Sequence, residues 1–265
     1  MSNGPYAFLG GEFVPLDDAK VGIQTHALHY GTAAFEGIRG NWNEDHGKVY
    51  IFRLKEHYER LIRGCKILQM DLPYSVDQYV DVTIELLQRN GYKQDVYIRP
   101  LAFKSEQLVA NLNLNALESD FGLIIIPFGS YIDNDRAIRC QTSSWRRPDD
   151  SIMPTGVKLT GLYTTSILAK TEALKAGFDE AILLNVNGTV SEGSGENLFM
   201  ITDGRISTPG ETENELLGIT RDTVKTLVKN ELGLEVVERV IHRSELYLAD
   251  EAFLTGTAAH VTSMG

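Results

Sequence analysis

The chain has 265 residues, 43% of them hydrophobic, and carries a formal net charge of −11. That acidity argues against a nucleic-acid backbone or an anionic membrane as the main partner, although a local basic pocket can still hold one phosphate. The apolar runs are too short to span a bilayer, and the N-terminus lacks the pattern of a signal peptide, so we expect a cytoplasmic protein. Cys65 and Cys140 lack metal-binding or CxxC spacing and are expected to be reduced core thiols.

The first half of the chain predicts short strands, two helices and two longer strands. Short strands and turns are expected over 7–15. Apolar spacing predicts one amphipathic helix over 54–69 and a second that starts after Ser75 and stops at Gly91. The longer strands are expected in VYIRPLAF (96–103) and FGLIIIPF (121–128).

A polar, turn-rich segment at 129–137 is interpreted as an interdomain loop. It divides the chain into a first domain over 1–128 and a second domain over 138–265. Because both halves mix strands with helices, we predict an α/β or α+β protein with its functional residues on connecting loops.

The second half predicts two helices that each end at a glycine. One runs from about Thr164 to Ala176 and is closed by Gly177, and the other runs from about Thr220 to Leu232 before Gly233. Strands are expected over 235–241 and 251–256.

Two hairpins are predicted between these helices. Asn187-Gly188 and Asp203-Gly204 each separate two apolar runs, and both dipeptides favour the positive φ angles of a type I′ turn.

Lys158 lies among small and apolar neighbours, with no acid beside it in the sequence. A desolvated amine loses its proton more easily and becomes a nucleophile. Many lysines in such surroundings only extend out of a half-buried strand into water. The residues around Lys158 leave both interpretations open.

Eight segments, in order, bear on that choice. They are HALHYGTAAFEGIRG (26–40), FRLKEHYERL (52–61), VYIRPLAF (96–103), SSWRR (143–147), VKLTGLY (157–163), NVNGTVSEGSGENLF (185–199), LLGITRDTV (216–224) and FLTGTAA (253–259). Together they resemble the branched-chain amino acid aminotransferases, within the fold type IV class of pyridoxal 5′-phosphate (PLP) enzymes. The resemblance implies a small N-terminal α/β domain, a larger C-terminal pseudo-barrel domain, and PLP in the cleft between them.

PLP chemistry needs a lysine, an acid beside the ring nitrogen, and anchors for phosphate and substrate carboxylate. By the resemblance, Lys158 is the Schiff-base lysine, Glu192 faces the pyridine nitrogen and Tyr163 binds the phenolic oxygen. Alone, Glu192 also fits a solvated acid at a strand end, and Tyr163 fits a core tyrosine. Gly193-Ser194-Gly195 follows a hairpin and lacks the third glycine of a dinucleotide fingerprint.

The resemblance assigns the cofactor phosphate to four residues, Arg60, Ile219, Thr220 and Thr257. Gly218 precedes a helix whose N-terminus attracts anions. Thr220 also fits a plain N-cap, and Arg60 a surface ion-pair partner. Leu216 is expected to pack on the pyridine ring, or else to be ordinary core.

On the substrate side, the resemblance implies a pocket for the side chain and carboxylate of an amino acid. Its residues are Phe35, Gly37, Tyr97, Arg99, Tyr131, Thr257 and Ala258. Arg99 suits the second carboxylate of 2-oxoglutarate, although strand alternation also allows it to point to water. Tyr30 matches a residue donated by a neighbouring subunit, which implies a homodimer or a higher homo-oligomer.

The function implied is transamination of branched-chain L-amino acids (leucine, isoleucine, valine) with 2-oxoglutarate, giving 2-oxo acids and L-glutamate by ping-pong kinetics. The loop 104–119 lacks the glycine common in the family, and relatives usually continue beyond the C-terminal HVTSMG. Alternatives therefore include an (R)-amine or D-amino acid transaminase and an aminodeoxychorismate lyase. A catalytically silent binding module would lack Lys158 or Glu192, and both are present. Apart from His26 and His29, which we expect to structure a turn, the histidines are scattered and predict no metal site.

Overall fold

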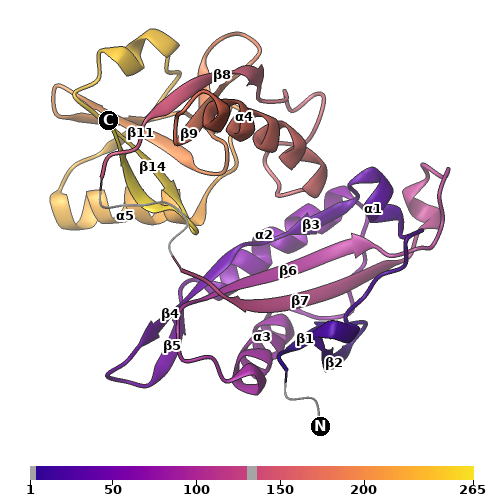
Figure 1. Cartoon of the computed structure of the whole chain (residues 1–265). Coiled ribbons are helices and arrows are strands. Elements are labelled where there is room, and N and C mark those ends of the chain that lie inside the picture. Colours follow the sequence, from indigo (N-terminus) through magenta and orange to yellow (C-terminus); the bar gives the residue numbers. More distant parts are fainter. Residues whose placement is uncertain (1–3, 130–135) are drawn as a thin grey trace. The chain divides into compact units, whose positions relative to one another are not determined.

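The computed structural model describes residues 4–129 and 136–265, which form two compact units (Figure 1). The first unit holds the chain up to Gly129 together with Val157–Gly161, and the second holds Ser130–Gly156 and Leu162–Gly265. Residues 157–161 therefore group with the N-terminal half of the chain, although they lie within the predicted second domain. Most of the predicted interdomain loop, 130–135, lies outside the described residues.

The first unit is built on a seven-stranded antiparallel sheet in the order β2-β1-β7-β6-β4-β5, with β3 also pairing with β6. The strands are β1 (Tyr6–Leu9), β2 (Glu12–Pro15), β3 (Ala33–Phe35), β4 (Ile38–Asn43), β5 (Lys48–Ile51), β6 (Val96–Lys104) and β7 (Ser119–Pro127). Three short helices, α1 (His26–Tyr30), η1 (Leu16–Asp18) and η2 (Leu114–Ala116), lie in its loops. The two longest strands, β6 and β7, pair along their whole length (Figure 1).

Two helices, α2 (Leu54–Ile67) and α3 (Val76–Asn90), pack on this sheet and on each other. Their contact is aromatic: Tyr58 stacks on Tyr79 with ring centroids 5.4 Å apart, and both rings contact Phe121 of β7. Phe121 pairs with Ala102 of β6, so Ala102 and every second residue from it face the helices. Tyr97 and Arg99 consequently lie on the opposite face of the sheet. The predicted helix start after Ser75 and stop at Gly91 are confirmed.

The second unit contains two sheets whose apolar faces share a core. One sheet has the order β10-β9-β8 and the other β13-β12-β11-β14-β15. The strands are β8 (Cys140–Arg146), β9 (Glu180–Leu184), β10 (Val190–Gly193), β11 (Asn197–Thr202), β12 (Arg205–Thr208), β13 (Val236–Glu238), β14 (Glu251–Gly256) and β15 (His260–Met264). Ile182 and Val190 of the first sheet pack with Leu198 and Leu254 of the second.

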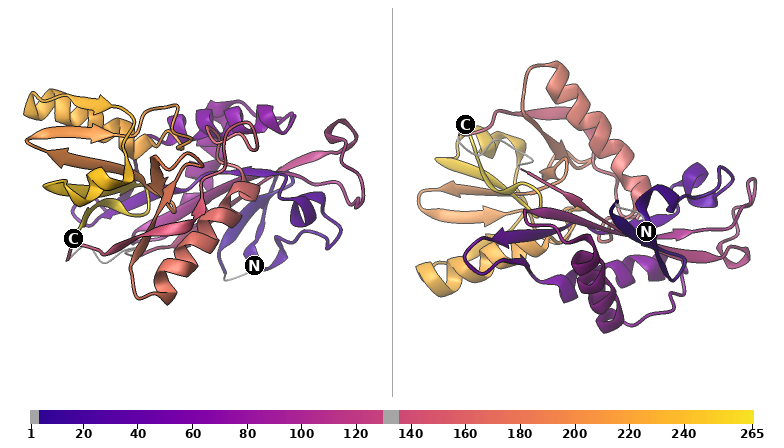
Figure 2. Two further views of the ribbon diagram at one scale, coloured as in Figure 1. Left: turned by 90° about the horizontal axis from the view of Figure 1, so that it is seen from above. Right: turned by 60° about the horizontal axis from the view of Figure 1, so that its bottom comes forward.

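Each sheet of the second unit carries one long helix. On the smaller sheet, Ala169 and Ala173 of α4 (Tyr163–Lys175) pack against β9. The larger sheet carries α5 (Ile219–Leu232) (Figure 2). Its Val228 packs against Phe199 of β11 and Ile206 of β12. Two shorter 3-10 helices are η3 (Thr160–Leu162), which runs into α4, and η4 (Arg243–Tyr247). The predicted combination of strands and helices in both halves is confirmed.

One of the two predicted hairpin turns is correct. Asp203 and Gly204 have φ angles of 50° and 71°, as a type I′ turn requires. The hairpin predicted at Asn187-Gly188 is also present, since β9 and β10 pair antiparallel, but its predicted turn type is wrong. Only Gly188 has a positive φ, and its N–H donates to the carbonyl of Asn185, which closes a turn one residue earlier. Asn187 instead accepts hydrogen bonds at its side chain from the backbone and hydroxyl of Thr189.

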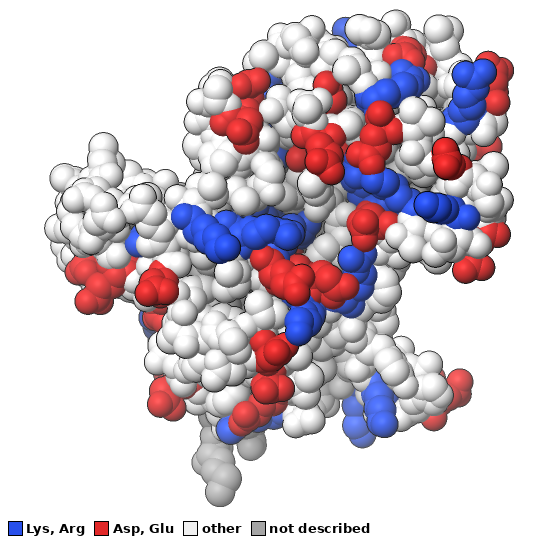
Figure 3. All heavy atoms as spheres, turned by 180° about the vertical axis from the view of Figure 1, so that it is seen from behind, with Lys and Arg blue, Asp and Glu red and all other residues white. Residues whose placement is uncertain are grey.

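The surface carries charges of both signs. On the face drawn in Figure 3, acidic side chains lie beside basic ones. Elsewhere in the structure, Lys55 pairs with Asp77 and Arg89 pairs with Glu85 in exposed ion pairs. Cys65 is buried and Cys140 half-buried, and neither forms a disulfide. Among the described residues, no helix combines the length and apolar character needed to cross a bilayer.

Candidate active site

In the first unit, Lys158 lies beside β3. The Phe35 N–H donates to the Lys158 carbonyl at 3.1 Å, and Ala34 forms an isolated bridge with Leu159. This pairing holds the Lys158 amine over the Phe35 ring, 5.1 Å from the ring centroid. The lysine side chain is half-buried. Its amine is thus held against an aromatic ring by backbone contacts.

Arg99 approaches the same aromatic ring. Its guanidinium carbon lies 4.6 Å from the Phe35 centroid, and Nη2 donates to the Tyr97 hydroxyl at 2.9 Å. Arg99 Nε is buried and finds no acceptor among the described residues. A Cβ at Gly37 would overlap the Tyr97 hydroxyl, so glycine leaves room for this tyrosine. The alternative in which Arg99 points to water is wrong, and the buried Nε suits an incoming carboxylate.

Arg60 is buried in α2 and forms a bidentate pair with Glu36. Its Nε and Nη2 donate to the two carboxylate oxygens at 2.6 and 2.8 Å, and His57 Nδ1 lies 2.8 Å from Glu36 Oε2. Burial raises the pKa of Glu36, but Arg60 and His57 outweigh this and lower it to about 2. The interpretation of Arg60 as a surface ion-pair partner is therefore wrong. Glu36 holds one edge of the guanidinium, which leaves its plane fixed.

Tyr30 lies on α1 and is 41% exposed. Its hydroxyl accepts from the Ala110 N–H at 2.9 Å. His26 bridges Thr32 and the Asn111 carbonyl, and His29 contacts the Ile23 carbonyl at 2.7 Å, so both histidines structure the loops around Tyr30 as expected. Tyr131, the remaining predicted pocket residue of this half, lies outside the described residues.

In the second unit, Glu192 is buried on β10 and held at both carboxylate oxygens. Oε2 accepts from the Leu216 N–H at 3.0 Å and from Asn197 Nδ2 at 3.3 Å, while Oε1 lies 3.0 Å from Arg147 Nη2. The alternative of a solvated acid at a strand end is wrong. Tyr163 is half-buried and opens α4.

The helix α5 begins next to this carboxylate. Its N-cap is Gly218, which provides no side-chain hydrogen bond, so the alternative of Thr220 as the N-cap is wrong. A Cβ at Gly218 would overlap Asn197 Oδ1, so glycine lets Asn197 lie against the helix start. Ile219 is buried and Thr220 half-buried in the first turn. Thr257 and Ala258 are half-buried between β14 and β15.

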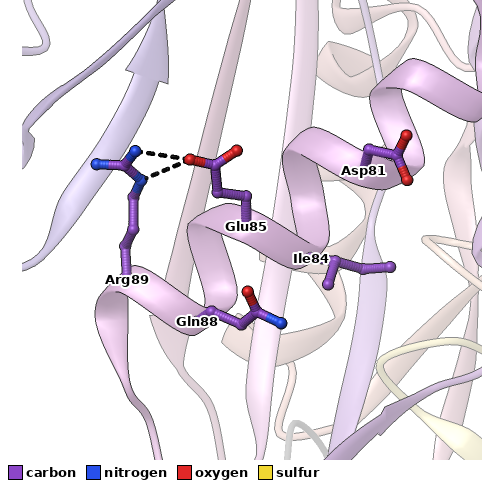
Figure 4. A pocket seen from close by; sticks show the side chains of 5 residues that line it. All are labelled: Asp81, Ile84, Glu85, Gln88 and Arg89. Carbon is purple, nitrogen blue, oxygen red and sulfur yellow. Dashed lines mark hydrogen bonds and ion pairs between the residues drawn. The ribbon is translucent and has the colours of Figure 1, made fainter.

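A surface hollow on α3 lies apart from the predicted site residues. Its lining residues, Asp81, Ile84, Glu85, Gln88 and Arg89, all come from one helix, and Arg89 is paired with Glu85 (Figure 4). None of the predicted site residues lines this hollow.

Comparison with known proteins agrees with this set of groups. The family model of class IV amino-transferases matches residues 33–264. A probable branched-chain-amino-acid aminotransferase of Aquifex aeolicus is 50% identical over 257 residues, covering 97% of this chain and 82% of the relative. The chain belongs to the class IV aminotransferases.

Solved structures of this family have the same fold. A branched-chain aminotransferase of Thermoproteus uzoniensis with norvaline superposes with a TM-score of 0.94 at 42% identity, covering 99% of this chain and 86% of that one. The PLP form of a Thermobaculum terrenum branched-chain aminotransferase gives 0.90 at 38% identity, covering 100% and 86%. The predicted family, fold class and enzyme class are confirmed.

Class IV aminotransferases use PLP, and the described residues of this aminotransferase fit that cofactor. They include an amine against an aromatic ring, a buried arginine on a fixed plane, a buried carboxylate, and a long helix that begins at a glycine. The amine suits the PLP aldehyde, the arginine and the helix N-terminus suit the phosphate, and the carboxylate suits the protonated ring nitrogen.

Four residues next to the predicted set were missed in the sequence. They are Glu36, which binds Arg60; His57, which binds Glu36; and Arg147 and Asn197, which bind Glu192. All four lie inside the segments that resemble the family, so their position in a motif was a usable signal. Asn197 is only five residues from Glu192, but the other three pairs join residues more than twenty positions apart, and spacing alone does not pair them.

Proposed function

We propose that this chain is a branched-chain amino acid aminotransferase that moves the amino group of leucine, isoleucine or valine to 2-oxoglutarate. The observation that carries this proposal is the shared contact of Lys158 and Arg99 with the Phe35 ring. This contact keeps the Lys158 amine near Arg99, whose buried Nε has no acceptor among the described residues, and the arrangement suits an amino acid bound by its carboxylate. The names of the relatives point to the same substrates.

The proposed roles are assigned to residues of the matching motifs. PLP, when bound, supplies the electron sink that makes the substrate Cα–H acidic. Lys158 would take that proton and return it at the neighbouring carbon, since its amine is held in one place against the Phe35 ring. Glu192 holds the proton of the ring nitrogen, and Tyr163 donates to the phenolic oxygen.

Anion binding is divided among several donors. Arg60, Thr220, Thr257 and the N–H groups that begin at Ile219 hold the phosphate, and Leu216 covers the ring. A helix N-terminus and a guanidinium both favour a doubly charged anion. Arg99 binds a substrate carboxylate. The residues proposed to contact the substrate side chain are Phe35, Gly37, Tyr97 and Ala258, together with Tyr131, which lies outside the described residues. Because one site serves both half-reactions, ping-pong kinetics follow.

The active enzyme is proposed to be a cytoplasmic homodimer or higher homo-oligomer in which Tyr30 serves the neighbouring subunit. Support comes from exposed apolar side chains near Tyr30: Ile23 is 78%, Leu28 60% and Leu112 81% exposed. Apolar side chains gathered in this way are typical of a self-association surface.

The test is the visible absorption of the purified holoenzyme before and after L-leucine alone. We expect a yellow band that L-leucine removes and 2-oxoglutarate restores, and Lys158→Ala should lose both the band and turnover while retaining the fold. A wild-type band that responds to an (R)-amine or a D-amino acid but not to L-leucine would overturn the substrate assignment. Turnover by Lys158→Ala at the wild-type rate would overturn the mechanism.

A further inference from the structure

Two adjacent arginines at the end of β8 have different surroundings. Arg146 is exposed and donates to the Ser143 carbonyl at 2.8 Å. Arg147 is 4% exposed, and its backbone N–H donates to the Leu184 carbonyl at 2.9 Å. The β8–β9 pairing is irregular between Thr142 and Arg146, which changes the side-chain alternation and turns Arg147 inward.

The Arg147 guanidinium joins two segments. Nε donates to the Asn214 carbonyl at 2.9 Å, and Nη2 lies 3.0 Å from Glu192 Oε1. The other Glu192 oxygen accepts from the Leu216 N–H, two residues after Asn214. Arg147 thus ties the carboxylate to the segment that binds its second oxygen, and rotation of the carboxylate would break contacts at both ends.

The electrostatic surroundings make this pairing necessary. Burial raises the pKa of both Glu196 and Glu215 to about 8, and the charge of Glu192 adds to the increase in each. Several buried carboxylates close to one another disfavour ionisation of all of them. A buried guanidinium at 3.0 Å stabilises the ionised form of Glu192 against this repulsion.

We propose that Arg147 is a positioning residue that keeps Glu192 ionised and correctly oriented, so that the ring nitrogen of bound PLP retains its proton. This inference rests on the proposed role of Glu192. Arg147 acts through the carboxylate. Without it, Glu192 takes up a proton or turns away, and the ring becomes a weaker electron acceptor.

The test uses Arg147→Met, which keeps length but removes charge, with Arg146→Met on the neighbouring exposed arginine as the matched control. The direct measurement is the ¹⁵N shift of PLP labelled at its ring nitrogen, bound to each holoenzyme. We expect a protonated nitrogen in the wild type and the control, a largely deprotonated one in Arg147→Met, and a partial return in Arg147→Lys. The kcat should fall by roughly 10–100-fold in Arg147→Met, with a smaller change in KM.

Folding is checked by a second measurement that needs no cofactor. Arg147→Met leaves a buried carboxylate without its cation, so we expect the apoprotein to melt earlier, and Arg147→Met/Glu192→Gln to recover part of the loss. If Arg147→Met does not fold, Arg147→Gln, which also removes the charge but keeps a hydrogen-bond donor, replaces it in the same nitrogen-shift measurement.

The outcomes separate this inference from the proposed function. A protonated nitrogen and normal kcat in Arg147→Met, together with a deprotonated nitrogen in Glu192→Gln, would overturn the role of Arg147 alone. A protonated nitrogen in Glu192→Gln would overturn the role of Glu192 and this inference with it. In the fallback case, a protonated nitrogen in Arg147→Gln, together with a deprotonated nitrogen in Glu192→Gln, would overturn the role of Arg147.

Discussion

At the scale of single residues, the buried arginines Arg60 and Arg147 owe their orientation to acids. Arg60 is held by Glu36, and Arg147 is held against Glu192. A guanidinium has five N–H donors in a rigid plane, so a carboxylate that occupies one edge directs the other. The sequence predicted Arg60 as an anion-binding residue. It did not predict that Glu36 pairs with Arg60, because that pair forms only when the end of β3 packs beside α2.

Glu36→Gln should weaken binding of the cofactor phosphate. The substitution leaves Arg60 and His57 with a neutral partner, so the buried guanidinium loses both its charge compensation and its fixed plane. We expect a PLP dissociation constant about 10–100-fold higher, and a loss of about 3 kcal/mol in the free energy of unfolding. Titration of the apoprotein with PLP and urea unfolding measure these changes.

The matched control is Glu56→Gln, on the same helix as Arg60. Glu56 pairs with Arg53 in a partly exposed ion pair, which should contribute less than about 1 kcal/mol. Equal effects of the two substitutions on PLP binding would contradict the positioning role of Glu36.

At the scale of elements, the start of α5 is fitted to the strand beside it. Gly218 is the N-cap, and Asn197 of β11 fills the space that a side chain at 218 would need. Asn197 also donates to the Leu216 carbonyl at 2.8 Å. The glycine at position 218 therefore also affects Glu192, because it leaves room for Asn197, which donates a hydrogen bond to the Glu192 carboxylate.

Gly218→Ala should disturb both the helix start and Glu192. Gly218 has a φ of −73°, which alanine adopts without strain, so the cost comes from overlap with Asn197. We expect a loss of about 1–3 kcal/mol in stability and weaker PLP binding, measured by thermal unfolding and titration. Gly129→Ala, where a Cβ meets open space, is the control. Identical behaviour of the two variants would show that Asn197 shifts at no cost.

At the scale of the whole molecule, the second unit buries several acids among apolar and polar neighbours. Asn197 Nδ2 lies 3.1 Å from Glu215 Oε2, and Arg221 lies 2.9 Å from Oε1. Burial nevertheless raises the pKa of Glu215 to about 8, with Arg221 opposing and Glu192 adding to the increase. Arg221 is shared with Glu238, which lessens its effect on Glu215.

This raised pKa predicts how stability changes with pH. The unfolded Glu215 ionises near the ordinary glutamate pKa of 4.5, whereas the folded one keeps its proton to about 8. The folded state therefore binds the extra proton between these values, and the free energy of unfolding falls as pH rises through that window. One such group contributes at most about 1.4 kcal/mol per pH unit.

Glu215→Gln should reduce this slope without abolishing it, because Glu196 has a similarly raised pKa. Urea unfolding of the apoprotein at intervals from pH 5 to pH 8 measures both slopes. A variant slope as steep as that of the wild type would show that Glu215 ionises normally in the folded protein.

The sequence by itself determined the longer helices and the family, but it did not predict the strands β3, β4, β5, β8 and β15. Apolar periodicity and glycine positions predicted α2, α3, α4 and α5 closely, because local backbone preferences decide where helices end. The motifs predicted the cofactor and the residues that we propose to touch it. The sequence mispredicted the type of turn at Asn187-Gly188. There the Gly188 N–H donates to the Asn185 carbonyl, and the Asn187 side chain accepts a hydrogen bond from the Thr189 N–H.

Only the tertiary structure decided which buried polar groups are neighbours. Glu36 with Arg60, Glu192 with Arg147 and Asn197 with Gly218 join residues on different elements. It also grouped Lys158 with Phe35, more than a hundred residues earlier in the chain. The physical reason is that pairing in a buried site depends on strand register and side-chain direction in space, and sequence spacing encodes neither across distant segments.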